Sequence, residues 1–282
     1  MIEKYYSGVI EQIYNRIGKE TRNIVMANYS NDFSIENLEV IRRYQSNEDN
    51  VFFAYSEFSY NTLVGAYEPF LDIICNMHRR FIGGSFDDFQ KECGVYYLHR
   101  QVLNSYYETG ECFREETVLL NEVAYEQRRM TMAIADMLKK LSEVKPLMIV
   151  INRFQMASKS SIETIKYLID NPCANIGIVL GVNAIVKGTD STVEVWDRIV
   201  ESLEDRSAIY YIGSAGPLKN NVKTTNDDEL YITMNFEQSI QEASNIMEFL
   251  DFEQARRGCR IIEHKLKFED AWIDEKSLRR FY

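Results

Sequence analysis

The sequence has no uncharged apolar run of 18 residues, and charged residues are spread through its first twenty positions. A membrane-spanning helix needs about 20 apolar residues, and a secretory signal needs an uncharged apolar core. Neither is therefore expected, and the chain is predicted to be cytoplasmic with no membrane partner.

Closely spaced cysteines or histidines that could form a disulfide framework or bind a metal ion are also missing. The five cysteines are widely spaced and never form a CxxC pair, and the three histidines have no second ligand at a spacing such as HExxH. We therefore expect neither a disulfide framework nor a metal site. His78 and His99 are each followed by an arginine, which indicates positions on the surfaces of helices.

An excess of positive charge is absent as well. The net charge is −11 and the pI is about 5.0, so no direct binding of nucleic acid by this segment is expected. The GxSxG pattern of serine hydrolases and the GxGxxG pattern of dinucleotide-binding enzymes are missing too. What the chain does have is length and apolar content, because 282 residues that are 45% hydrophobic can fill a large core.

Short apolar runs alternate with segments of helical periodicity along most of the sequence. Helices are predicted at 2–17, from Ser34 onward, around 70–81, and at 115–144, 160–169 and 192–203. Buried strands are predicted at 23–27, 50–55, 145–154, 175–183 and 208–212. This alternation predicts an α/β fold with a mainly parallel five-stranded sheet covered by helices.

The end of the sequence has a different character. Residues 213–229 gather turn-forming and polar residues, which indicates a linker or exposed loop after an α/β domain at 1–212. Residues 230–282 are predicted to form a helical extension. Its final "SLRRFY" has apolar residues with nothing downstream to cover them, so we expect a longer protein.

The order of elements resembles the P-loop ATPase domain of the STAND and AAA-like signalling ATPases, especially those that precede helical repeats in large bacterial regulators. The resemblance covers most of the chain. It is strongest at "KPLMIVINRFQMASKSSIETIKYLIDNP" (145–172), which is similar to the Walker B strand, turn and helix, and at 50–74, where Tyr67 and Pro69 precede a helix. It implies a P-loop NTPase-like three-layer sandwich.

The departures from the family fall on the residues that would contact phosphate. The pattern GxxxxGK[ST] laid on "ANYSNDFS" (27–34) matches only at Ser34. Ala27 and Asp32 replace the glycines and Phe33 replaces the lysine, so that Asp32 would repel phosphate oxygens.

The residues that position magnesium in the resembled family are replaced as well. The acidic pair that follows the Walker B strand appears here as Asn152 and Arg153, neither of which can act as a general base. Asn183, at the end of the fourth strand, matches the polar sensor position of the family, although an asparagine there also suits a turn.

The resemblance and its departures imply a catalytically inactive ATPase-like module of a multidomain bacterial signalling or transcription-regulatory protein. Such a module would bind protein partners or copies of itself, would be followed by tetratricopeptide-type repeats and an output domain, and would need no cofactor. Two alternatives stay open: an atypical ATPase that binds ATP and magnesium, and a sensor that holds a small molecule in the former nucleotide crevice.

Overall fold

The computed structural model describes residues 6–29, 35–46, 50–58, 63–114, 118, 122–183, 193–206, 208–212 and 236–268. Asp32, Phe33, Ser34 and the predicted linker at 213–229 lie outside these ranges. No helix among the described residues is long and apolar enough to cross a membrane.

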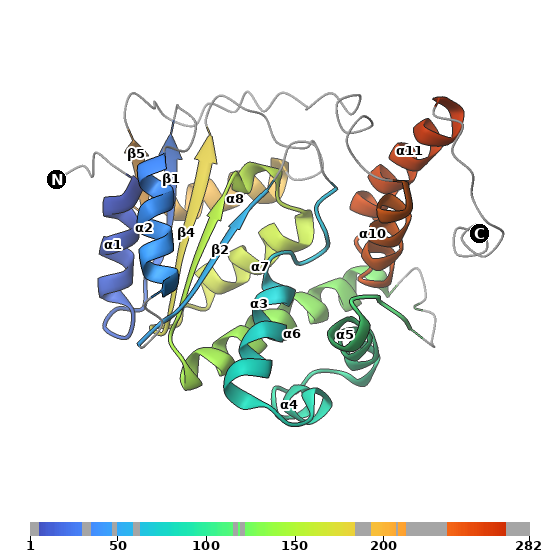
Figure 1. Cartoon of the computed structure of the whole chain (residues 1–282), viewed down its shortest axis with the longest axis horizontal. Coiled ribbons are helices and arrows are strands. Elements are labelled where there is room, and N and C mark those ends of the chain that lie inside the picture. Colours follow the sequence, from blue (N-terminus) through green and yellow to red (C-terminus); the bar gives the residue numbers. More distant parts are fainter. Residues whose placement is uncertain are drawn as a thin grey trace.

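Five parallel strands form the centre of the molecule (Figure 1). They are β1 (Ile24–Tyr29), β2 (Phe52–Glu57), β3 (Leu147–Asn152), β4 (Ile176–Asn183) and β5 (Ile209–Ile212). The order in the sheet is β2-β3-β4-β1-β5. Every residue of β3 is buried, as expected for a strand whose two faces are both covered by helices. The predicted α/β fold with a parallel five-stranded sheet is confirmed.

Helices cover both faces of this sheet and complete a P-loop NTPase-like three-layer sandwich (Figure 1). The first face carries α1 (Tyr6–Arg16) and α2 (Ile35–Ser46), and α1 packs on Val25, Ala27 and Val179. The second face carries α6 (Val123–Val144), α7 (Lys159–Asp170) and α8 (Val193–Glu204), whose apolar residues join the larger core cluster.

A helical lobe is inserted between β2 and α6. It consists of α3 (Phe70–Met77), the π-helical turn η1 (His78–Ile82), α4 (Phe86–Glu92) and α5 (Tyr97–Thr109). A short 3-10 turn, η2 (Phe154–Met156), follows β3.

The predicted helical extension begins with two helices that pack on this lobe, α10 (Phe236–Glu248) and α11 (Phe252–Phe268) (Figure 1). The ring of Phe249, between the two helices, makes edge contacts with Tyr67 and Tyr106 at centroid distances of 5.7 and 6.1 Å. This helical pair is thus part of the same apolar core as the lobe.

Two sequence predictions about the lobe are wrong. The last helix before β3 begins at Val123 instead of about residue 115, since the described residues Val118 and Glu122 before it are not helical. His78 and His99 are buried, at 0% and 1% exposure, instead of lying on helix surfaces, because His78 packs against aromatic rings of α4 and α5 and His99 packs against Glu126 of α6.

The connections after β1 and β4 define where this sheet can offer a crevice. The chain leaves β1 toward α2 on the first face and leaves β4 toward α8 on the second, although the two strands are neighbours. Adjacent strands whose connections diverge in this way open a crevice at their carboxyl ends, which is the usual ligand site of open α/β sheets.

Candidate functional site

Polar residues gather at the carboxyl ends of the strands. β1 ends at Tyr29, β2 at Glu57, β3 at Asn152 and β4 at Asn183. Strand register pairs Tyr29 with Asn183 and Glu57 with Asn152, and the second pair is level with Gly181, two residues before Asn183. We call these four strand ends together the carboxyl edge.

A hydrogen bond spans the carboxyl edge from β1 to β3. The Tyr29 hydroxyl donates to Asn152 Oδ1 at 2.6 Å, across the intervening strand β4. The residue beneath this bond is Gly181, where an added Cβ would lie 2.6 Å from the Tyr6 hydroxyl and 3.0 Å from Asn152 Oδ1. Glycine is therefore required at this position so that Tyr6, Tyr29 and Asn152 can meet over β4.

Arg153 contacts two residues of the carboxyl edge, Asn152 and Glu57. Its backbone is left-handed, with φ of 55°, and its amide donates to Asn152 Oδ1 at 3.0 Å. Its guanidinium Nη2 lies 3.2 Å from Glu57 Oε1, and the Tyr55 hydroxyl donates to Glu57 Oε2 at 2.8 Å. Both oxygens of the Glu57 carboxylate are thus engaged by side chains of this chain.

Burial decides the protonation of the phenols at this edge. It raises the pKa of Tyr6 well above its usual value, and the nearby Tyr29, Tyr55 and Glu57 raise it further. Burial, together with Glu57, also raises the pKa of Tyr55. Both hydroxyls therefore stay protonated at neutral pH and do not act as bases.

The chemistry available at the carboxyl edge follows from these contacts. An asparagine amide cannot accept a proton from water, and the Glu57 carboxylate is already bonded to a guanidinium and a phenol. Among the described residues, no group of three His, Cys, Asp or Glu side chains is arranged to hold a metal ion. The edge is organised to hold its own side chains in place.

The structure places some of the residues predicted from the nucleotide motifs at the carboxyl edge and others elsewhere. Asn152 and Arg153 come together at the end of β3, and Asn183 ends β4 in register with Tyr29. Ala27 lies inside β1 with its side chain buried in the core, because the strand continues to Tyr29 where the sequence predicted its end at residue 27.

Sequence reasoning missed Tyr6, Tyr29, Tyr55 and Glu57. Tyr29 was assigned to a loop, and the alternation of Tyr55 with Glu57 at the end of β2 was the one available signal, because residues two apart on a strand share a face. The approach of Tyr6 from α1 depends on tertiary packing alone.

Comparison with known proteins adds no assignment to this geometry: no protein-family model matches the sequence, and a search of curated proteins finds no significant match.

Proposed function

We propose that this chain is a catalytically inactive ATPase-like module that serves a regulatory or scaffold role in a multidomain signalling or transcription-regulatory protein. One observation carries the proposal. The end of β3, where the resembled ATPases carry the acidic pair that positions magnesium and water, holds Asn152 and a guanidinium that is bonded to Glu57.

The physical argument concerns charge. Magnesium binds oxygen ligands and is usually held by carboxylates, so a fixed guanidinium beside the carboxylate competes with the ion for the same oxygens. Asn152 offers one amide oxygen that already accepts two hydrogen bonds, from the Tyr29 hydroxyl and from the Arg153 amide. With neither a metal ligand set nor a base at this position, hydrolysis of a nucleotide lacks both electrostatic stabilisation and water activation.

The test is isothermal titration of the purified chain with ATP, ADP and GTP, with and without magnesium, together with an assay for phosphate release. We expect no magnesium-dependent binding at micromolar concentration and no hydrolysis. Arg153→Ala is the informative variant, because it frees Glu57 without restoring the lysine and glycines of the phosphate loop. This variant should remain inactive, and hydrolysis by either protein would contradict the proposal.

One alternative is favoured by a specific feature, the diverging connections of the neighbouring strands β1 and β4, because ligands of open α/β sheets bind in the crevice at such a point. A sensor for a small molecule would use this crevice without chemistry. Nucleotide binding that is independent of magnesium and leaves the nucleotide intact would support that second function, whereas tight magnesium-dependent binding would favour an atypical ATPase.

A further inference from the structure

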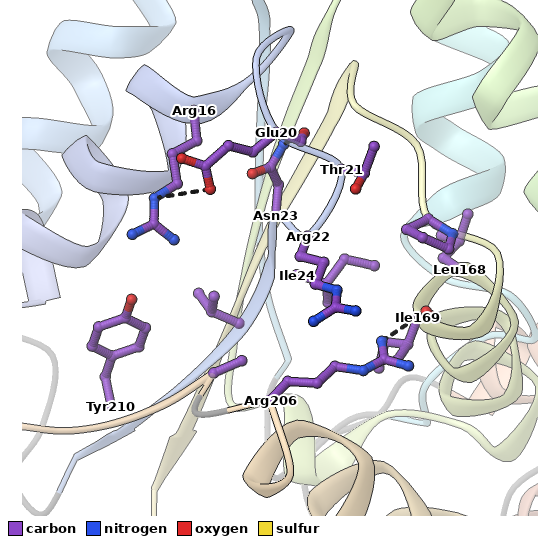
Figure 2. Close-up of a pocket in the computed structure, with 13 residues that line it drawn as sticks. Arg16, Glu20, Thr21, Arg22, Asn23, Ile24, Leu168, Ile169, Arg206 and Tyr210 are labelled. Atoms are coloured by element: carbon purple, nitrogen blue, oxygen red, sulfur yellow. Dashed lines mark hydrogen bonds and ion pairs between the residues drawn. The ribbon is translucent and has the colours of Figure 1, made fainter.

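A second site candidate lies at the opposite, amino-terminal end of the sheet. A cavity of about 130 Å³ opens there between the start of β1, the end of α7 and the start of β5 (Figure 2). It exists because β5 pairs with β1 only from Met26 onward, so the first two residues of β1 have no neighbouring strand on that side.

The lining of this cavity is positive in a strongly negative protein. It contains Arg16, Arg22 and Arg206 against the single carboxylate of Glu20, a formal charge of +2 in a chain of −11. Glu20 does not neutralise all three arginines: its Oε2 lies 3.7 Å from Arg16 Nε, and both side chains lie on the other side of β1 from Arg22 and Arg206 (Figure 2).

Two guanidinium groups are left facing the same space. Arg22 and Arg206 both line the cavity on the same side of β1, and the Arg206 side chain runs toward Ile169 (Figure 2). Arg206 Nη1 donates to the Ile169 carbonyl at 2.9 Å, which fixes its plane and leaves its other N–H groups available. Within the described ranges, Arg22 makes no hydrogen bond or ion pair. Like charges that converge without a counter-charge repel, and an anion between them removes that repulsion.

Hydrogen bonds to the backbone fix the loop that carries Arg22. Asn23 is fully buried, and its Nδ2 donates to the carbonyls of Glu20 and Ala174 at 2.6 and 3.2 Å. The Gly18 amide donates to the same Ala174 carbonyl at 2.8 Å. The position of the Arg22 backbone is thus set by the fold.

From these contacts we propose that the cavity binds a phosphate group between Arg22 and Arg206. The guanidinium fork matches the oxygens of phosphate, and a doubly charged anion suits two cations. The cavity volume of about 130 Å³ leaves room for a phosphate group. The phosphate is free or is the head of a small monoester whose remainder projects through the open mouth. This site is separate from the carboxyl edge and does not depend on the function proposed for it.

The experiment is titration of the full chain with inorganic phosphate, with glycerol phosphate and with acetate, at matched ionic strength. We expect saturable binding of inorganic phosphate and weaker binding of acetate, which carries one charge. Equal or tighter binding of glycerol phosphate identifies a monoester as the ligand, and its exclusion identifies free phosphate. Binding that does not saturate by about ten millimolar phosphate, or acetate binding as tight as that of phosphate, would overturn the proposal.

Variants distinguish specific binding of phosphate in this cavity from general electrostatic attraction of anions to the protein. Arg22→Gln should weaken phosphate binding about tenfold, the effect of losing one charge-assisted hydrogen bond. Arg206→Gln should do the same. Arg42→Gln removes an equal charge from an exposed position on α2 away from the cavity and should change nothing. Equal weakening by all three variants, or no weakening by Arg22→Gln, would refute the site. Because Arg22 is exposed, its variant should unfold at the wild-type temperature when no ligand is present.

Discussion

At the scale of single residues, Gly181 is the point on β4 over which side chains from α1, β1 and β3 converge. The absent side chain leaves room for the Tyr6 hydroxyl and for Asn152 Oδ1, both of which an added Cβ would approach within 3.0 Å. This close approach, and not backbone conformation, is the reason for glycine at this position.

Gly181→Ala should therefore destabilise the protein by about 1–3 kcal/mol, the usual cost of overpacking a core. Tyr6→Phe removes the hydroxyl that the new methyl group would strike, so the double variant should be more stable than the sum of the two single effects predicts. Urea unfolding of the four proteins measures this coupling. Strict additivity would show that Tyr6 and residue 181 are not in contact.

Glu68 is a second residue whose surroundings determine its behaviour. Its Oε2 accepts a hydrogen bond from the Gly65 amide at 2.8 Å, and it lines a cavity of about 160 Å³ together with Asp72 and Glu242. Burial raises the pKa of Glu68 to about 7, and repulsion from Asp72 and Glu242 acts in the same direction. The folded protein therefore holds a proton that the unfolded chain, with a pKa of about 4.5, releases.

This difference predicts that stability falls as pH rises. The contribution of Glu68 is fully present below about pH 4.5 and is lost by about pH 7, a change of at most about 3 kcal/mol. Glu68→Gln keeps a neutral side chain at every pH, so it should flatten the stability profile between pH 5 and 7. Urea midpoints measured across this range test the prediction. Glu92→Gln, at an exposed position on α4, is the matched control and should keep the wild-type slope.

At the scale of elements, α10 and α11 approach each other closely at Gly258. A Cβ at Gly258 would lie 2.9 Å from the Ala243 Cβ and 3.0 Å from Leu63 Cδ2, so α11 approaches both α10 and the loop that precedes α3. The same region is tied by Gln254, whose Nε2 donates to the Val64 carbonyl at 2.9 Å.

Gly258→Val should push α11 away from α10 and from that loop. We expect a loss of about 1–3 kcal/mol and faster cleavage of the chain near α11 in limited proteolysis, because the helix loses its buried contacts. Arg256→Ala changes the exposed side of the same helix and should leave the cleavage rate unaltered. Equal protection of both variants would contradict the packing of α11 described above.

At the scale of the whole molecule, the predicted helical extension and the helical lobe share one core. Ile246, Phe249, Ala255 and Ile261 belong to the cluster that also contains residues of α3, α5 and α6. Polar contacts reinforce this arrangement: the Arg114 guanidinium donates to the Glu248 carbonyl at 2.6 Å. We therefore expect residues 236–268 to unfold together with the rest of the chain.

A protein that ends at residue 235 should lose on the order of 5 kcal/mol, since each large apolar side chain that leaves the core contributes about 1.5–3 kcal/mol. Calorimetry and urea unfolding of the shortened and full chains measure the loss. An unchanged midpoint would show instead that the α/β domain at 1–212 is independent of the two helices.

The candidate site was recovered from the sequence only in part. Asn152 and Arg153 were found because they stand where the resembled family carries the acidic pair that follows its Walker B strand. Glu57 was not found, because its contact with Arg153 joins residues far apart in the sequence and leaves no periodic signal.

The sequence by itself determined the local elements, since burial of one helix face or of a whole strand imposes a periodicity that can be read directly. It thereby determined the α/β class and the parallel sheet. Tertiary structure alone decided the partner of Arg153, the burial of His78 and His99, and the attachment of α10 and α11 to the lobe. Each of these depends on surfaces brought together from distant parts of the chain, which local periodicity does not encode.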